Sequence, residues 1–313
     1  MGSKFFATLA AFGLLLHAQD EPIYRLRVRL VHLLATVKDT TGNLVGDLKP
    51  QDFLVHDNGV LQKISVFERQ TEQPLSVALL IDNSGSTARD LKYEVDSVSR
   101  FVHALFQEGN DKDRAALYSF NYQVVKQTPF TRQASQIDRA VRQLRGEAGT
   151  SLYDAIFLAG GELYGREGRH VMVIVTDGGD TTSQKDFQAA LESAQRADTV
   201  IYPILVVPIE NEAGRNTGGE NALTTLASET AGRVFAPSVG ASLDQAFGQI
   251  ITELRTQYFI GYYPKDVPSR RDHFHQITVN LLRPGLRIST RSGYYGETET
   301  TDPGTPNVSV LPH

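Results

Sequence analysis

The sequence predicts an α/β protein with a doubly wound, mostly parallel sheet, helices on both faces, and flanking N- and C-terminal β segments that form a small β-sandwich. Three observations lead to this fold class. Two apolar runs, Leu75–Asp82 and Val171–Asp177, have the length and composition of strands buried on both faces. Strand-like and helix-like segments alternate through the middle of the chain. Alternating β patterns return towards both ends.

The middle block, residues 74–256, carries the alternating elements. Its first strand is Leu75–Asp82, and the next segment, Ala88–Phe106, has apolar residues at the spacing of one buried helix face. Further strands are expected at Arg114–Phe120, Gln123–Gln127, Arg169–Thr176, Val200–Val207 and Arg233–Phe235, and further helices at Ala134–Leu144, Ser151–Leu163, Phe187–Arg196, 221–231 and 241–256. This alternation is typical of a parallel sheet covered by helices on both sides.

Two β-rich segments, residues 19–73 and 257–296, flank this block. The first contains Asn58-Gly59, a strong hairpin signal between strand-like runs. Two β segments on either side of an α/β insert are most simply parts of one sandwich, so we expect them to pair. The segment 297–313 contains mainly Thr, Glu, Pro and other polar residues with one Gly, and we expect a disordered tail there.

Residues 1–18 have the pattern of a secretory signal peptide. Lys4 supplies a positive start, Phe5–Leu16 is almost wholly apolar, and Ala18 is a small residue at the expected cleavage position. The alternative is an uncleaved anchor, but about 12 apolar residues fall short of the roughly 20 that a membrane-spanning helix needs. We therefore expect an exported protein, periplasmic or extracellular, with no integral membrane span after cleavage.

Composition narrows the function classes. The formal charge is −5, and this acidic balance argues against nucleic acid as the main partner. The chain has no cysteine, which excludes disulfides and thiolate zinc sites. A hydrophobic fraction of 41% is ample for a core.

The two apolar runs both end on an aspartate followed by small residues, Asp82-Asn-Ser84-Gly-Ser86 and Asp177-Gly-Gly. Because parallel strands end on the same edge of a sheet, both carboxylates are expected in one crevice at that edge. Two carboxylates with the hydroxyls of Ser84 and Ser86 form an all-oxygen cluster that suits a hard divalent cation. The alternative is that Asp82 and Ser84 only cap the following helix, a role compatible with metal binding.

The Asp82-to-Ser86 stretch, Gly149-Thr150-Ser151 and Thr176-Asp177-Gly178-Gly179 together resemble the metal-ion-dependent adhesion site of the von Willebrand factor type A domain, whose sheet is Rossmann-like. The resemblance covers roughly residues 74–256, and the wider chain is similar to bacterial von Willebrand factor A-related proteins, abundant in acidobacteria. It implies that Ser84, Ser86 and Thr150 bind the metal directly, and that Asp82 and Asp177 act largely through bound water.

The function implied by this resemblance is metal-dependent protein binding, as in cell adhesion. The cation, Mg²⁺ in the first instance with Mn²⁺ or Ca²⁺ as options, keeps an open position that an Asp or Glu of a protein partner fills. A structural alternative is an envelope scaffold whose metal site only stabilises loops. No catalytic residues and no organic cofactor are expected, because neither a hydrolase elbow nor a phosphate-binding glycine loop is present. The sequence leaves the partner and the oligomeric state open.

Overall fold

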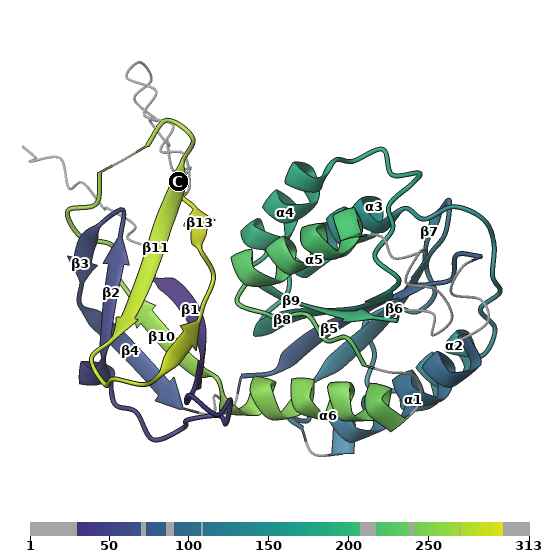
Figure 1. Ribbon diagram of the computed structural model, residues 1–313, viewed down its shortest axis with the longest axis horizontal. Helices are drawn as coiled ribbons and strands as arrows, with labels where there is room; N and C mark the ends of the chain where they lie inside the picture. Colours follow the sequence, from purple (N-terminus) through teal and green to yellow (C-terminus); the bar gives the residue numbers. More distant parts are fainter. Residues whose placement is uncertain are drawn as a thin grey trace, which may run out of the picture.

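The computed structural model describes residues 30–69, 73–85, 91–107, 109–206, 217–237, 241–268 and 270–296. The predicted signal peptide and tail lie outside these ranges. Two domains lie side by side along the long axis of the molecule (Figure 1). One is a helix-covered sheet formed by the middle of the chain, and the other is built from β segments that precede and follow it.

The larger domain is organised around a five-stranded sheet of order β7-β6-β5-β8-β9. The central strand β5 pairs in parallel with β6 and β8, β8 pairs in parallel with β9, and only the edge strand β7 is antiparallel. Side chains along β5 and β8 are buried throughout, as expected for strands covered on both faces. The strands are β5 (Leu75–Asp82), β6 (Arg114–Phe120), β7 (Val124–Lys126), β8 (Arg169–Thr176) and β9 (Thr199–Leu205).

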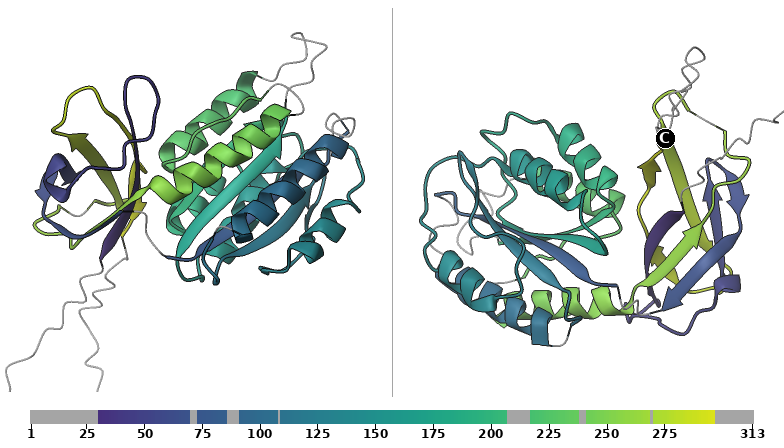
Figure 2. Two further views of the ribbon diagram at one scale, coloured as in Figure 1. Left: turned by 90° about the horizontal axis from the view of Figure 1, so that it is seen from below. Right: turned by 180° about the vertical axis from the view of Figure 1, so that it is seen from behind.

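Helices cover both faces of this sheet, α1, α2 and α6 on one and α3, α4 and α5 on the other (Figures 1 and 2). Alternate residues of each strand point to opposite faces, so Leu79 belongs to the core under α1 and α6, while Leu80 belongs to the core under α3 and α4. The helices are α1 (Leu91–Gln107), α2 (Ala134–Val141), α3 (Leu152–Leu163), α4 (Phe187–Arg196), α5 (Thr217–Glu229) and α6 (Ala241–Thr256).

The smaller domain is a sandwich of two four-stranded sheets, with orders β12-β1-β10-β4 and β13-β11-β2-β3. Each sheet combines strands from before and after the α/β domain, and the two inner faces share one apolar core. The predicted fold class is therefore confirmed. The strands are β1 (Val31–Lys38), β2 (Phe53–Asp57), β3 (Val60–Gln62), β4 (Ile64–Arg69), β10 (Tyr258–Tyr262), β11 (Phe274–Leu281), β12 (Arg287–Ser289) and β13 (Gly293–Tyr295), with a 3-10 turn, η1 (Pro50–Asp52), before β2.

Asn58 and Gly59 form the predicted hairpin turn between β2 and β3. Both have positive φ, 46° and 83°, as the favoured two-residue hairpin turn requires. One predicted strand differs. Arg233–Phe235 contributes only an isolated bridge, in which Phe235 pairs with Ile204 through two backbone hydrogen bonds.

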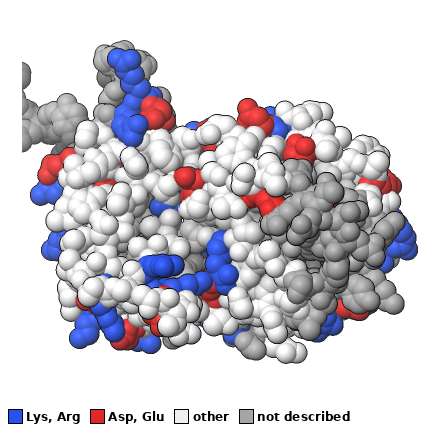
Figure 3. Space-filling view, in the orientation of Figure 1, with Lys and Arg blue, Asp and Glu red and all other residues white. Residues whose placement is uncertain are grey.

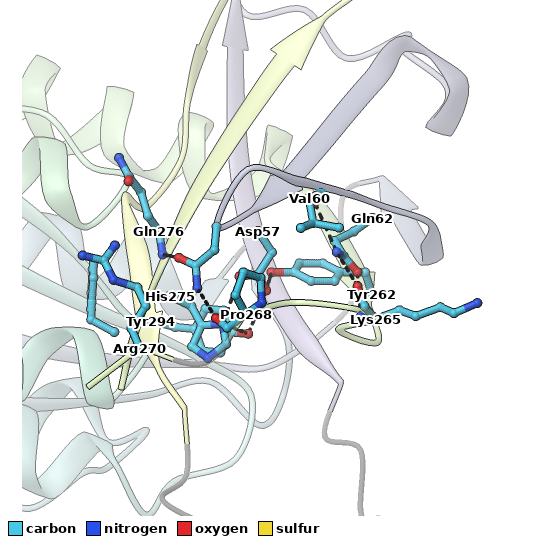
Figure 4. Close-up of polar contacts among 12 residues, drawn as sticks. Asp57, Val60, Gln62, Tyr262, Lys265, Pro268, Arg270, His275, Gln276 and Tyr294 are labelled. Carbon is cyan, nitrogen blue, oxygen red and sulfur yellow. Dashed lines mark hydrogen bonds and ion pairs between the residues drawn. The ribbon is translucent and has the colours of Figure 1, made fainter. Parts of the chain in front are cut away.

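A buried carboxylate links the two sheets of the sandwich. Asp57 is fully buried at the end of β2, and its carboxylate accepts 2.8 Å hydrogen bonds from the hydroxyls of Tyr262 and Tyr294. Nδ1 of His275 lies 2.9 Å from the other carboxylate oxygen. These partners come from β10, β13 and β11, so one side chain connects both layers (Figure 4).

The two domains meet at a cavity of about 250 Å³ on the side where β8 and β9 begin. Four arginines line it, Arg166, Arg169, Arg196 and Arg291, and basic side chains are visible in the hollow between the domains (Figure 3). Arg291 crosses the junction, because its guanidinium pairs with Asp198 of the α/β domain. The chain also connects the domains directly, because a single residue, Gln257, separates the end of α6 from the start of β10.

Candidate metal centre

Asp82 is the last residue of the central strand, and it is fully buried. The apolar residues before Asp82 make β5 the central strand of the sheet, between β6 and β8. Asp82 therefore lies between the ends of these two neighbouring strands. Its Oδ1 accepts a 2.8 Å hydrogen bond from the backbone amide of Ser84, two residues on. The carboxylate is thus held in a turn at the carboxyl edge of the sheet, where ligands of open α/β sheets bind.

Thr176, the last residue of β8, joins this strand end to its neighbour. Its hydroxyl donates a 2.7 Å hydrogen bond to Oδ2 of Asp82 and accepts a 3.1 Å hydrogen bond from the amide of Gly178. Asp177, the next residue, is half-buried, and its Oδ1 accepts a 3.2 Å hydrogen bond from the amide of Gly179. The two carboxylates therefore come from adjacent parallel strand ends, as the sequence predicts.

Thr150 lies two residues before the start of α3, in a loop that is hydrogen-bonded to the chain after Asp177. Its carbonyl oxygen accepts hydrogen bonds of 2.8 Å and 3.1 Å from the amides of Thr181 and Thr182. Its own amide donates to the hydroxyl of Thr181 at 3.0 Å, and the hydroxyls of Ser151 and Thr182 lie 2.8 Å apart. These two threonines were not identified from the sequence, because no local pattern marks their role.

The same loop is fastened to the turn after β5. Ser84 forms a parallel bridge with Glu147, whose amide donates a 3.0 Å hydrogen bond to the carbonyl of Asn83. The side-chain amide of Asn83 donates to the carbonyl of Arg145 at 2.6 Å. The structure thus brings Asp82, Ser84, Thr150 and Asp177 to one edge of the sheet. Ser86 lies outside the described residues.

The electrostatics of this edge are unfavourable for an uncompensated carboxylate. Burial raises the pKa of Asp82 to about 6, although the hydrogen bonds from Thr176 and Ser84 lower it, and the neighbouring Asp177 carboxylate adds to the increase. A cation at this edge would favour the ionised form of Asp82.

The donor chemistry fits a hard divalent cation. In the described part of the chain, no group of three or more His, Cys, Asp or Glu side chains could hold a metal, so a cation here depends on hydroxyls as well as the two carboxylates. Magnesium takes an octahedral oxygen shell at about 2.1 Å and keeps part of its water. Each carboxylate oxygen has two lone pairs, so the hydrogen bonds to Asp82 are compatible with a water-mediated contact to the metal.

The helix-covered domain that carries this edge matches the model of a known family. The family model for the von Willebrand factor type A domain matches residues 76–249, more than half of the chain. The chain belongs to the von Willebrand factor type A family. Modules of this family generally mediate protein interactions.

Several solved structures are similar to this chain at low sequence identity. The von Willebrand domain of the type V pili tip protein Mfa5 from Porphyromonas gingivalis is 16% identical over 57% of this chain and 94% of that chain, with a TM-score of 0.48. An aerotolerance-related membrane protein from Bacteroides fragilis is 20% identical over 57% and 98%, with a TM-score of 0.45. The pilus adhesin SpaC from Lactobacillus rhamnosus GG is 10% identical over 82% of this chain and 49% of its own, with a TM-score of 0.49.

A comparison with curated protein sequences finds no match. Within the described ranges, no helix has both the length and the apolar character that crossing a membrane requires.

Proposed function

We propose that this protein captures a protein partner through a divalent cation held by Asp82, Ser84, Ser86, Thr150 and Asp177. In this proposal Mg²⁺ is the first choice of ion, and the three hydroxyls bind it directly. Asp82 and Asp177 supply negative charge through bound water. The cation keeps one position that a partner's Asp or Glu occupies, so the protein acts as a binding module and not as an enzyme.

The observation that carries the proposal is the convergence of two aspartates from adjacent strand ends with a threonine loop tied to both. Hydrogen bonds connect Asp82 to Thr176 and connect the Thr150 loop to Thr181 and Thr182. The raised pKa of Asp82 in the metal-free protein supports it further, since a buried carboxylate is costly unless a cation or donor compensates it. Export, suggested by residues 1–18, belongs to the same proposal.

The first experiment separates metal binding from helix capping. Mg²⁺ and Mn²⁺ are titrated into wild type, Asp82→Ala and Asp186→Ala by calorimetry. Asp186 is the matched control because its carboxylate caps α4, accepting a 2.8 Å hydrogen bond from the amide of Ala189. We expect Asp82→Ala to lose metal binding and Asp186→Ala to keep it. Equal metal affinity in wild type and Asp82→Ala would overturn the proposal.

The second experiment separates partner capture from a purely structural metal. Water-proton relaxation of the Mn²⁺-loaded protein reports whether the ion carries exchangeable water. Adding a short Asp-containing peptide should decrease the relaxation as the carboxylate displaces that water, and EDTA should abolish peptide binding. No response to the peptide would favour the scaffold alternative, in which the metal only stabilises loops.

A further inference from the structure

Tyr122 lies against the Thr150 loop of the candidate metal centre. It follows β6, whose last residue, Phe120, is in register with Asp82. The carbonyl of the preceding Asn121 accepts a 2.7 Å hydrogen bond from the amide of Ser151, next to Thr150. Tyr122 also covers Gly149, because a Cβ placed on that glycine would lie 2.9 Å from the Cβ of Tyr122.

The backbone of Tyr122 is held in place by this environment. Asn121 is buried, and its side-chain oxygen accepts a 2.9 Å hydrogen bond from the amide of Gln123. The amide of Asn121 in turn donates to the carbonyl of Gln123 at 3.1 Å. The tyrosine therefore sits in a closed turn anchored to the Thr150 loop, and little backbone freedom is lost when a ligand contacts it.

The ring of Tyr122 nevertheless faces solvent. Its side chain is 53% exposed, and no hydrogen bond or ring contact to another described residue is present. The buried tyrosines behave differently, since the hydroxyls of Tyr118, Tyr258 and Tyr262 all have hydrogen-bond partners. An exposed tyrosine on an anchored backbone is the kind of residue that supplies much of the energy of protein interfaces.

We propose that Tyr122 is a specificity-determining residue, which packs against an apolar or aromatic side chain flanking the acidic residue that the partner presents to the cation. This inference rests on the proposed metal-dependent function. In an extended peptide, side chains two residues apart point to the same face. The partner segment is therefore an extended acidic motif with an aromatic or apolar residue two positions from its Asp or Glu.

The test compares two peptides, acetyl-Phe-Gly-Asp-Gly-Phe-amide and acetyl-Ser-Gly-Asp-Gly-Ser-amide, in Mg²⁺ and in EDTA. We expect the Phe peptide to bind wild type about 5- to 10-fold more tightly, the gain typical of an aromatic pair. Tyr122→Ala should bind both peptides with the affinity of the Ser peptide, and Tyr122→Phe should keep the preference. Tyr263→Ala, which removes a 50% exposed tyrosine in the sandwich, is the matched control and should behave as wild type.

The outcomes distinguish this inference from the function on which it rests. Mg²⁺-dependent binding of both peptides with equal affinity would overturn the role of Tyr122 and leave the proposed function intact. Failure of both peptides to bind the Mg²⁺-loaded protein would overturn the proposed function. A loss of Mg²⁺ affinity in Tyr122→Ala would assign the residue to support of Thr150 and overturn its role in specificity.

Discussion

The hydroxyl of Thr176 donates a 2.7 Å hydrogen bond to Oδ2 of Asp82, which joins the carboxyl ends of the two central parallel strands. The same hydroxyl accepts from the amide of Gly178 and is thereby oriented. Thr176 is buried and is itself outside the proposed ligand set. Its position makes it a supporting residue for the candidate metal centre, where such partners influence affinity through the ligand they orient.

Replacing Thr176 by valine should weaken metal binding with little effect on the fold, because the shape is kept and the hydroxyl is lost. We expect Mg²⁺ affinity to fall about 10-fold, the lower range for the loss of a residue that orients a ligand. Calorimetric titration gives the affinity. Thr252→Val on the exposed side of α6, where the hydroxyl bonds only to the carbonyl of Gly248, is the control. An unchanged Mg²⁺ affinity in Thr176→Val would show that Thr176 does not support the metal centre.

The metal-free protein should become more stable when Asp82 is replaced by asparagine. The folded-state pKa of Asp82, about 6, lies above the ordinary value of 3.8, so the folded state holds more protons between these values. The contribution of Asp82 to the free energy of unfolding is therefore complete below about pH 4 and lost as the pH rises through about 6. At pH 7.5 in EDTA, Asp82→Asn should gain up to about 3 kcal/mol.

Urea unfolding of wild type and Asp82→Asn in EDTA, at pH 7.5 and at about pH 4, measures this difference in the free energy of unfolding. The gain should disappear at the acidic pH, where the wild-type carboxyl is protonated. Asp111→Asn, at a fully exposed side chain, should change stability little at either pH. A variant less stable than wild type at pH 7.5 would contradict the expectation and indicate that the hydrogen bonds to Asp82 outweigh its burial.

Substituting Gly149 by alanine should damage both stability and metal binding. Gly149 has φ +86°, and a Cβ there would meet the Cβ of Tyr122 at 2.9 Å. We expect a loss of about 1–3 kcal/mol of unfolding free energy, as for other strained backbone positions, and displacement of Thr150. Gly161→Ala within α3 is the matched control, because nothing lies within 4 Å of its added Cβ and alanine favours the helix. Equal stability of the two variants would refute the argument.

Removing the Asp57 carboxylate should destabilise the sandwich strongly. Asp57→Ala leaves the hydroxyls of Tyr262 and Tyr294 without their acceptor inside the core. The free energy of unfolding should fall by about 3–5 kcal/mol, the range for removing one partner from a buried charged interaction. Denaturant unfolding measures it, with the exposed Asp272→Ala as control. A cost below about 1 kcal/mol would show that water replaces the carboxylate.

The sequence predicted the fold class and the edge of the sheet because hydrophobic patterning is a local signal. Leu75–Asp82 is apolar up to its last residue, so its burial, its strand character and the place of its carboxylate follow from the run itself. The Asn58-Gly59 turn is likewise local, because its backbone angles require those residue types. The short run at Arg233–Phe235 could not be resolved in this way, since three residues carry little periodicity.

Contacts between residues far apart in the chain were decided only by the tertiary structure. The hydrogen bonds of Thr181 and Thr182 to Thr150, the burial of Asp57 beside Tyr262, and the position of Tyr122 over Gly149 all depend on how separate loops and layers meet. No spacing in the sequence encodes them, because each side chain's partner is set by packing of the whole sheet and sandwich. The sequence therefore determined which residues end the strands, and the tertiary structure decided which side chains hold those ends together.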